Sequence, residues 1–353
     1  MSFGPEHYVP VLKVKRGEKH ALRLISEDLQ ARITPILEIV VRTPPKTVAA
    51  HLDNSFAKLS DAVRPYPKCF IDTREIAGDG VRAVADAFRR ATEAEINFTP
   101  VTGISRIVDI APALAHATNG IAIRLTRAEL EQGGLGAKIN GFMREKRLSH
   151  EQCDLIMDLG PVENFVMEGI ASLTEAFMSE VPNHSLWRTF TISSCAFPRS
   201  MGVVDRNSHE LVERAEWLAW KTQLYEGRQS IERVPTFSDC AIQHPAGVEG
   251  FDPKIMAVSA AIRYTLEEAW LLIKGESTRR TRPGEQFPAL ARRLVYGDLR
   301  EHYLGKRHCA GCTLIKSAAD GESGLGSAEA WRKLGSIHHI SLAAQGVASL
   351  SWP

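Results

Sequence analysis

The sequence predicts a (β/α)8 barrel of the TIM type followed by a C-terminal extension. Eight short apolar segments alternate with helical segments, and such alternation is typical of parallel βαβ units. We expect residues 1–250 to form the barrel, because eight units in this length match its size, and residues 251–353 to pack on it. The alternative is a doubly wound open sheet. That fold normally has about five or six strands and a glycine-rich first turn, whereas the first turn here reads Lys-Arg-Gly-Glu.

The eight expected strands are apolar runs, most of which carry a charged or hydroxyl residue near the C-terminal end. They cover residues 9–15, 34–40, 69–74, 98–104, 120–126, 154–160, 187–194 and 237–244. Helical patterns begin near residue 18 and cover residues 47–63, 81–95, 107–117 and 210–226, with further helical segments before residues 148 and 180. The glycines at 133, 134 and 136 indicate a joint between helices, because no strand directly precedes them.

The pattern changes after residue 244. Residues 261–265 and 270–274 predict a hairpin joined by an acidic turn, and residues 287–296 predict a helix. Residues 277–284 are an arginine-rich loop. We expect this loop either to be exposed to solvent or to contact nucleic acid. A short helix is expected around Trp331, and residues 335–340 have the pattern of a strand start.

The composition excludes several classes of protein. Lys and Arg number 43 against 42 Asp and Glu, so the formal charge of +1 does not suggest a bulk nucleic-acid or membrane binder. No run approaches the roughly 18 apolar residues of a membrane helix, and no signal pattern opens the chain. We therefore expect a cytoplasmic protein with reduced thiols, in which Cys69, Cys153, Cys195 and Cys240 are buried filler.

Polar side chains gather at the C-terminal ends of the expected strands, where the active sites of such barrels lie. They are Lys13, Lys15, Glu38, Asp72, Arg74, Arg124, Asp158, Ser193, Asp239 and Gln243. Burying so many charges costs several kcal/mol each unless they are paired. A ligand site explains the set, and helix caps or ion pairs across the rim are the alternative.

These residue types suit an anionic substrate such as a phosphate or a carboxylate. The expected catalytic residues are Glu38, Asp72 and Asp158, as general acid and base or as oxygen ligands of Mg²⁺ or Mn²⁺. The expected substrate-binding residues are Lys13, Lys15, Arg74, Arg124, Ser193, Asp239 and Gln243, with the arginines as bidentate clamps. A lysine on the first strand is also found in barrels that bind pyridoxal phosphate, but Lys15 suits a phosphate equally well.

A second constellation lies in the extension. His308-Cys309-Ala-Gly-Cys312 contains two cysteines at the spacing of half a zinc site, and His338 or His339 could complete it. We predict a structural Zn²⁺ with Cys309, Cys312 and His338 as ligands. A turn with satisfied or exposed thiols is the alternative, because a strand at residues 335–340 would put only one histidine on each face.

The opening of the chain carries a family resemblance. Residues 8–18 (YVPVLKVKRGE), Ala21-Leu22 and residues 34–38 (TPILE) resemble the phage-type beta protein family of phages and bacterial genomes. Residues 261–264 (AIRY) and the His-Cys-x-x-Cys segment are similar to it too. The resemblance implies a phage or phage-defence setting and transfers no catalytic residue.

Two hypotheses of function remain open. The first is an enzyme that binds a phosphorylated or nucleotide-like substrate at the barrel mouth, with metal-assisted phosphodiester hydrolysis as the candidate reaction. The second is a non-catalytic sensor or protein-interaction module in phage–host conflict, with a protein partner from a defence system. No H-x-H or H-E-x-x-H pair follows any expected strand, which argues against a hydrolytic transition-metal centre. Neither hypothesis involves a membrane.

Overall fold

The computed structural model describes residues 2–247, 259–277, 283–322 and 325–350. Eight parallel strands form one sheet in the order β1-β2-β3-β4-β5-β6-β7-β9. They are β1 (Val11–Lys13), β2 (Ile36–Glu38), β3 (Cys69–Asp72), β4 (Phe98–Thr102), β5 (Ile121–Thr126), β6 (Cys153–Pro161), β7 (Thr189–Cys195) and β9 (Thr236–Ser238). The backbone nitrogens of Val9 and Val11 bond to the carbonyls of Phe237 and Asp239, at 3.1 and 2.8 Å, and so bring the last strand back to the first. The expected barrel is confirmed.

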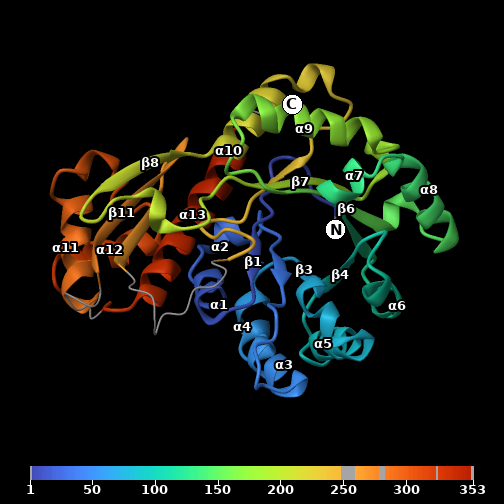
Figure 1. The fold of residues 1–353 in the computed structure, drawn as a ribbon, viewed down its shortest axis with the longest axis horizontal. Helices are drawn as coiled ribbons and strands as arrows, with labels where there is room; N and C mark the ends of the chain where they lie inside the picture. The colour runs from blue at the N-terminus through green and yellow to red at the C-terminus, as the bar shows by residue number, and fades with distance from the viewer. Residues whose placement is uncertain (1, 248–258, 278–282, 323–324, 351–353) are drawn as a thin grey trace.

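Helices surround this sheet (Figure 1). They are α1 (Arg16–Leu22), α2 (Glu27–Gln30), α3 (Val48–Phe56), α4 (Leu59–Val63), α5 (Val81–Glu93), α6 (Ile107–Ala115), α7 (Arg127–Glu131), α8 (Leu135–Glu145), α9 (Met167–Glu180) and α10 (Ala215–Ala219). The single helix expected over residues 47–63 is two helices, because Lys58 adopts a left-handed backbone with φ of 59° between them. Gly133 and Gly134 also have positive φ, and they form the expected joint between α7 and α8.

The extension is a second, antiparallel sheet covered by helices. Its strands are β8 (His209–Glu213), β10 (Ser259–Thr265) and β11 (Ala269–Ser277), in the order β10-β11-β8. Its helices are α11 (Pro283–Val295), α12 (Ala310–Ala319) and α13 (Ala328–Ser349). The hairpin and the helix near residue 290 are confirmed. The expected boundary between residues 250 and 251 and the arginines at 279, 280 and 282 lie outside the described residues.

Two elements differ from expectation. The start of the helix expected over residues 210–226 is strand β8, because Leu211 and Val212 pair with Leu271 and Trp270 of β11. The extension thus includes a strand that comes from between two barrel strands. The strand expected at residues 335–340 is part of the 22-residue helix α13. Residues 334–341 are buried on all sides of this helix, so the sequence lacks the 3.6-residue period by which a surface helix is recognised.

Helix α13 joins the two lobes of the molecule, which are the barrel and the extension. It packs against β10 of the extension and against α1 of the barrel, whereas α11 and α12 lie farther out (Figure 1). Gly335 makes the close crossing possible, because a Cβ there would lie 2.7 Å from the carbonyl oxygen of Arg263 on β10. No helix in the described ranges is both long and apolar enough to cross a membrane.

Candidate functional site

Arg124 on β5 is the centre of the charge cluster at the barrel mouth. It is 2% exposed, and its Nη1 lies 2.7 Å from Glu38 and 2.8 Å from Asp72. Its Nη2 lies 2.8 Å from Asp158. These side chains converge because Glu38 and Asp72 are in register on β2 and β3, as are Thr126 and Asp158 on β5 and β6. The parallel strands therefore bring all three carboxylates to one arginine.

Further ion pairs enclose this centre. Lys13 lies 2.7 Å from Glu38 and 3.0 Å from Glu75, and Arg106 lies 2.6 Å from Asp72. Four cations and five carboxylates thus form what we call the Arg124 network. Its members are Lys13, Glu38, Asp72, Arg74, Glu75, Arg106, Asp109, Arg124 and Asp158.

The network favours the charged forms of Glu38, Asp72 and Arg124, whereas burial raises the pKa of Asp109 despite its contact with Arg106. Burial alone would raise the pKa of Glu38 and of Asp72, but the facing cations outweigh burial and lower both pKa values. The same carboxylates raise the pKa of Arg124 well above its ordinary value. The cations at the mouth therefore already have carboxylate partners without a ligand, as the ion-pair alternative predicts.

This pairing bears on the expected divalent cation. Glu38, Asp72 and Asp158 would be its oxygen ligands, but each already contacts Arg124 within 3 Å. A Mg²⁺ or Mn²⁺ ion would have to displace that arginine, so the residues at the mouth do not fit a resident divalent metal. Arg74 is the loosely held member: it is 35% exposed and lies 3.9 and 3.6 Å from Glu38 and Asp158.

A second buried cluster, which we call the Asp239 junction, follows strand β9. The Tyr8 hydroxyl donates to Asp239 at 2.5 Å, and Nε2 of His339 on α13 lies 2.9 Å from the other carboxylate oxygen. Arg214, just before α10, lies 3.7 Å away. Burial would raise the pKa of Asp239, but His339 and Arg214 lower it to about 2. Burial lowers the pKa of His339, so the junction ties the barrel to the extension through a buried hydrogen bond from this imidazole to Asp239.

Glu216 on α10 lies beside this junction. Burial and the nearby charge of Asp239 raise the pKa of Glu216 to about 8. It forms no ion pair with a cation in the described parts of the chain. At neutral pH this carboxyl group is therefore mostly protonated, unlike Glu38 and Asp72, whose pKa values are lowered.

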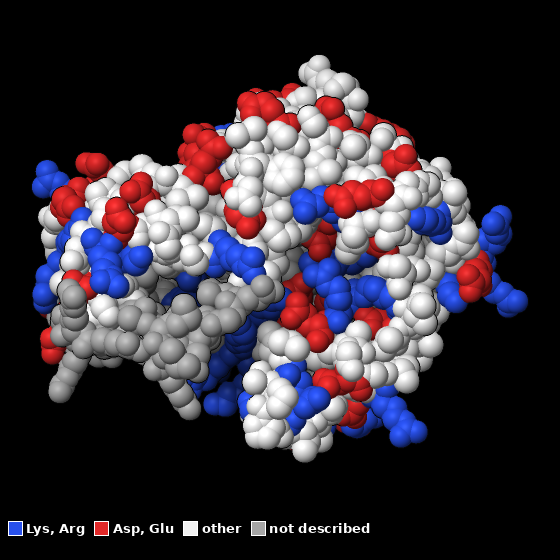
Figure 2. All heavy atoms as spheres, viewed as in Figure 1, with Lys and Arg blue, Asp and Glu red and all other residues white. Residues whose placement is uncertain are grey.

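Two adjoining pockets form a basic groove; the first lies between the barrel and the extension, and the second is lined by barrel residues alone. The first pocket has a volume of about 410 Å³, and six lysines and arginines but only two glutamates line it. The six cationic residues are Lys15, Arg16, Arg199, Arg263, Arg332 and Lys333. The second pocket has a volume of about 620 Å³, and no Asp or Glu lines it. Its cationic residues are Lys15 and Arg16, which also line the first pocket, and Lys19, Arg23, Lys46 and Lys58. Figure 2 shows Lys and Arg side chains in the hollow between the two lobes.

Positive charges in this groove crowd one another. Burial, followed by the charge of Arg332, lowers the pKa of Arg263 to about 10. Burial and the charges of Lys333 and Arg23 lower the pKa of His20. The two acids of the groove already have partners: Glu329 forms an ion pair with Arg16, one of the groove cations, at 2.5 Å, and Glu18 accepts a hydrogen bond from the neutral amide of Gln243. The groove is thus electrostatically suited to an anion.

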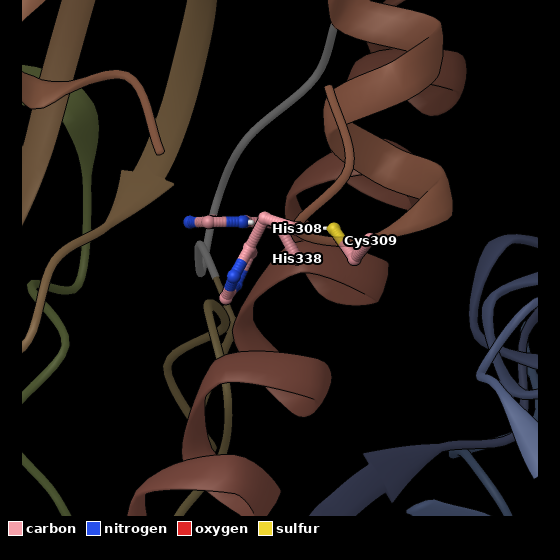
Figure 3. Close-up of side chains that lie close together, drawn as sticks. All are labelled: His308, Cys309 and His338. Atoms are coloured by element: carbon pink, nitrogen blue, oxygen red, sulfur yellow. Dashed lines mark hydrogen bonds between the residues drawn. The ribbon is translucent and has the colours of Figure 1, made fainter. Parts of the chain in front are cut away.

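A cysteine and histidine cluster lies at the start of α12. His308, Cys309 and His338 place one potential ligand atom each within 4.8 Å of the others (Figure 3). Cys312 adds its sulfur 3.3 Å from Nδ1 of His338. His308, Cys309 and His338 form a possible metal-binding group, whereas Cys312 is close to His338 but is not part of this mutually close set.

The comparison with known families decides the identity. A sequence model described as "Beta protein" matches residues 8–345, nearly the whole chain. The chain belongs to the beta protein family. The resemblance seen in the opening residues is confirmed. A search of curated proteins found no match to this beta protein.

Several solved structures were found to be similar, including the following two. A mandelate racemase/muconate lactonizing protein from Herpetosiphon aurantiacus is 11% identical, with a TM-score of 0.35 over 77% of this chain and 63% of that chain. A predicted mandelate racemase from Rhodobacter sphaeroides is 13% identical, with a TM-score of 0.32 over 76% and 57%. This beta protein spans less than two thirds of either chain, and a likeness this low carries no argument about activity.

The structure brings together some of the predicted site residues and separates others. Lys13, Glu38, Asp72, Arg74, Arg124 and Asp158 share the Arg124 network. Lys15 lies apart: strand β1 ends at Lys13, and the exposed Lys15 is the N-cap of α1 in the groove. Gln243 lines the groove, and Asp239 lies in the junction. Ser193 is buried in register with Asp158.

Sequence reasoning missed Arg106, Tyr8, Arg214 and Glu216, and it considered His339 only as an alternative zinc ligand and not as a partner of Asp239. Arg106 follows strand β4, so the rule that polar residues cluster after barrel strands could have found it. The other four give no such signal, because their roles depend on how the extension docks.

Proposed function

We propose that this beta protein binds a phosphate-bearing or nucleotide-like ligand in the basic groove. The observation that carries the proposal is the lining of the two pockets, in which cations crowd together and the few acids are already paired. Arginine and lysine are the side chains that best recognise phosphate, through forked hydrogen bonds and point charge respectively. A ligand with more than one phosphate would contact both pockets at once.

The groove also adjoins the barrel mouth. A small pocket lined by Lys13 and Glu38 shares Gln243 and Ser336 with the first pocket of the groove. A ligand in the groove would therefore lie close to Lys13, a partly exposed member of the Arg124 network. This arrangement supports binding better than hydrolysis, because Glu38, Asp72 and Asp158 would have to release Arg124 before serving as acid, base or metal ligands. Ligand binding without chemistry suits a sensor in phage–host conflict.

Calorimetry tests the groove. The protein is titrated with nucleotides, sugar phosphates and short oligonucleotides, each with and without Mg²⁺. We expect a phosphorylated compound to bind, and the double variant Arg332→Ala, Lys333→Ala to weaken binding at least tenfold. The matched control is Arg89→Ala, an exposed arginine on α5 outside both pockets. If no phosphorylated compound binds, or if the control weakens binding as much as the double variant, the proposal is wrong.

We also propose that the extension holds a structural zinc ion with Cys309, Cys312 and His338. The supporting observation is that Nδ1 of His338 lies 3.8 and 3.3 Å from the two sulfurs. Protein produced with zinc in the medium should contain about one zinc per chain, and chelators should loosen the extension. Absence of zinc by elemental analysis, with both thiols freely alkylated, would exclude this site.

A further inference from the structure

The positions of Cys309, Cys312 and His338 match a tetrahedral zinc site before any metal binds. Zn–S and Zn–N bonds of about 2.3 and 2.1 Å at the tetrahedral angle separate nitrogen from sulfur by roughly 3.6 Å. Nδ1 of His338 lies 3.8 Å from Cys309 Sγ and 3.3 Å from Cys312 Sγ. Both nitrogen–sulfur distances are therefore within a few tenths of an ångström of the tetrahedral value.

A neighbouring carbonyl sets the orientation of His338. Its Nε2 lies 2.7 Å from the carbonyl oxygen of Thr265 at the end of β10. A carbonyl only accepts, so Nε2 carries the proton and Nδ1 presents a bare lone pair to the two sulfurs. Metal-binding histidines usually donate their second ring nitrogen to a carbonyl or a carboxylate in this way.

His308 lies on the open side of this group. Its ring centroid is 5.2 Å from that of His338, with the planes at 63° to each other. One of its ring nitrogens is within 4.8 Å of both Cys309 Sγ and a nitrogen of His338. Its Nε2 is buried and finds no hydrogen-bond partner among the residues that the structure describes. A buried polar atom without a partner is unfavourable, and coordination of a metal would remove this cost.

Two glycines allow these segments to meet. Gly311, between the cysteines, could not carry a side chain, because a Cβ there would lie 2.7 Å from the carbonyl of Leu334 on α13. Gly335 makes the matching close contact between α13 and β10. The start of α12, the middle of α13 and the end of β10 therefore converge where the four candidate ligands lie.

From this geometry we infer that His308 is the fourth ligand and that the site is a closed Cys2His2 zinc site. The inference rests on the zinc site proposed above and adds the ligand that completes it. Four protein ligands leave no open position for water or substrate, so the ion is structural rather than catalytic. On binding, Zn²⁺ replaces the two thiol protons, which pass to solvent, and the two imidazoles bind in their neutral forms.

The site would fix α13, which has two further roles in this structure. Arg332 and Lys333 on α13 line the basic groove, and His339, one residue beyond His338, reaches Asp239. Adjacent residues on a helix point about 100° apart, so one helix can face the zinc ligands and the barrel at once. Zinc would therefore hold the extension in the position that completes the groove.

X-ray absorption spectroscopy of the full-length zinc-loaded protein tests the ligand count directly, without a variant. We expect a first shell of two sulfurs and two imidazole nitrogens. In a chelator competition, His308→Ala should bind zinc at least tenfold more weakly than the wild type, with one imidazole fewer in the spectrum. His302→Ala is the matched control, because this half-buried histidine of the same loop pairs only with Glu301 and lies outside the cluster.

The outcomes separate the two proposals. A first shell of two sulfurs and one imidazole, with unchanged zinc affinity in His308→Ala, would overturn the assignment of His308 and leave the three-residue site intact. Protein that takes up no zinc even when supplied with it would overturn both. Equal loss of affinity in His302→Ala and His308→Ala would show that the loop, and not a bond from His308, is responsible, and would also overturn the assignment.

Discussion

The Arg124 network and the Asp239 junction lie at the same end of the barrel but differ in origin. All members of the first come from the barrel strands and the segments that directly follow them. The second combines Tyr8 near the start of the chain, Arg214 before α10, Asp239 after β9 and His339 in the last helix. The first cluster completes the barrel from within, and the second attaches the extension to it.

The two clusters also differ in the protonation of their acids. Around Arg124 the cations outweigh burial and lower the pKa of Glu38 and Asp72. Beside Asp239, burial outweighs the cations at Glu216 and raises its pKa to about 8. Glu38 and Asp72 lie within 3 Å of Arg124, and Glu216 has no such contact among the described residues. Contact with a cation is not sufficient by itself, because burial outweighs Arg106 at Asp109 and raises the pKa of that carboxyl group.

Removing the central arginine should have the largest effect on stability. Arg124→Met leaves three buried carboxylates without their main partner, and breaking a buried pair in this way costs about 3–5 kcal/mol. Urea unfolding should show this loss as a lower midpoint. Arg89→Met is the control, because its partners on α5 are at the surface. A loss below about 1 kcal/mol would show that the network is hydrated and not a source of stability.

The pH dependence of stability should distinguish the two clusters. An acid whose folded pKa is about 8, against 4.5 for the free side chain, binds its proton more tightly when folded. Stability should therefore fall as pH rises, by roughly 3 kcal/mol between pH 5 and 8. Glu38 and Asp72, with lowered pKa values, contribute stability that is lost only as pH falls below the ordinary carboxyl range.

The difference between wild type and Glu216→Gln isolates this contribution. Unfolding free energies measured across the pH range should diverge for the two proteins above pH 5, with the variant becoming relatively more stable. Parallel curves would mean that Glu216 is charged in the folded protein and that the contrast between the clusters is wrong.

Loss of His339 should weaken the attachment of the extension to the barrel without unfolding the barrel. His339→Ala removes one partner of Asp239 but leaves Tyr8 and Arg214, so we expect a loss of about 2 kcal/mol. Hydrogen exchange should increase in α13 and remain unchanged in β5 and β6 around Arg124. Uniformly faster exchange in the barrel strands would instead make the junction part of one cooperative core.

Much of the fold was predictable, because the local pattern of apolar and polar residues indicates the alternating strands and helices. The convergence of Glu38, Asp72, Arg124 and Asp158 was predictable for the same reason, since parallel strands in register end together. The sequence could not predict that these residues form ion pairs with one another, because a ligand-binding site would contain the same residue types.

The rest depends on contacts distant in sequence. Strand β8 forms because β11 pairs with it, and helix α13 resembles no surface helix because its middle is buried on all sides. The basic groove draws its cations from five separate parts of the chain: α1 with Lys15, α3 with the segments that flank it, the loop after β7, β10, and α13. No local pattern brings these together, and the near-neutral total charge conceals them.

Substitution of Arg74 should have the smallest effect on stability. This substitution distinguishes a role in ligand binding from a role in stability within the Arg124 network. Arg74 is 35% exposed and more than 3.5 Å from Glu38 and Asp158, so its ion pairs resemble surface pairs and contribute less than about 1 kcal/mol. Arg74→Ala should therefore leave the urea midpoint nearly unchanged. The same change should weaken a phosphorylated ligand that extends from the groove to the mouth, by roughly 2 kcal/mol or about thirtyfold in calorimetry, because a charged partner loses a charge-assisted bond. A variant that loses stability but binds the ligand normally would place Arg74 with the structural ion pairs, and the ligand wholly within the groove.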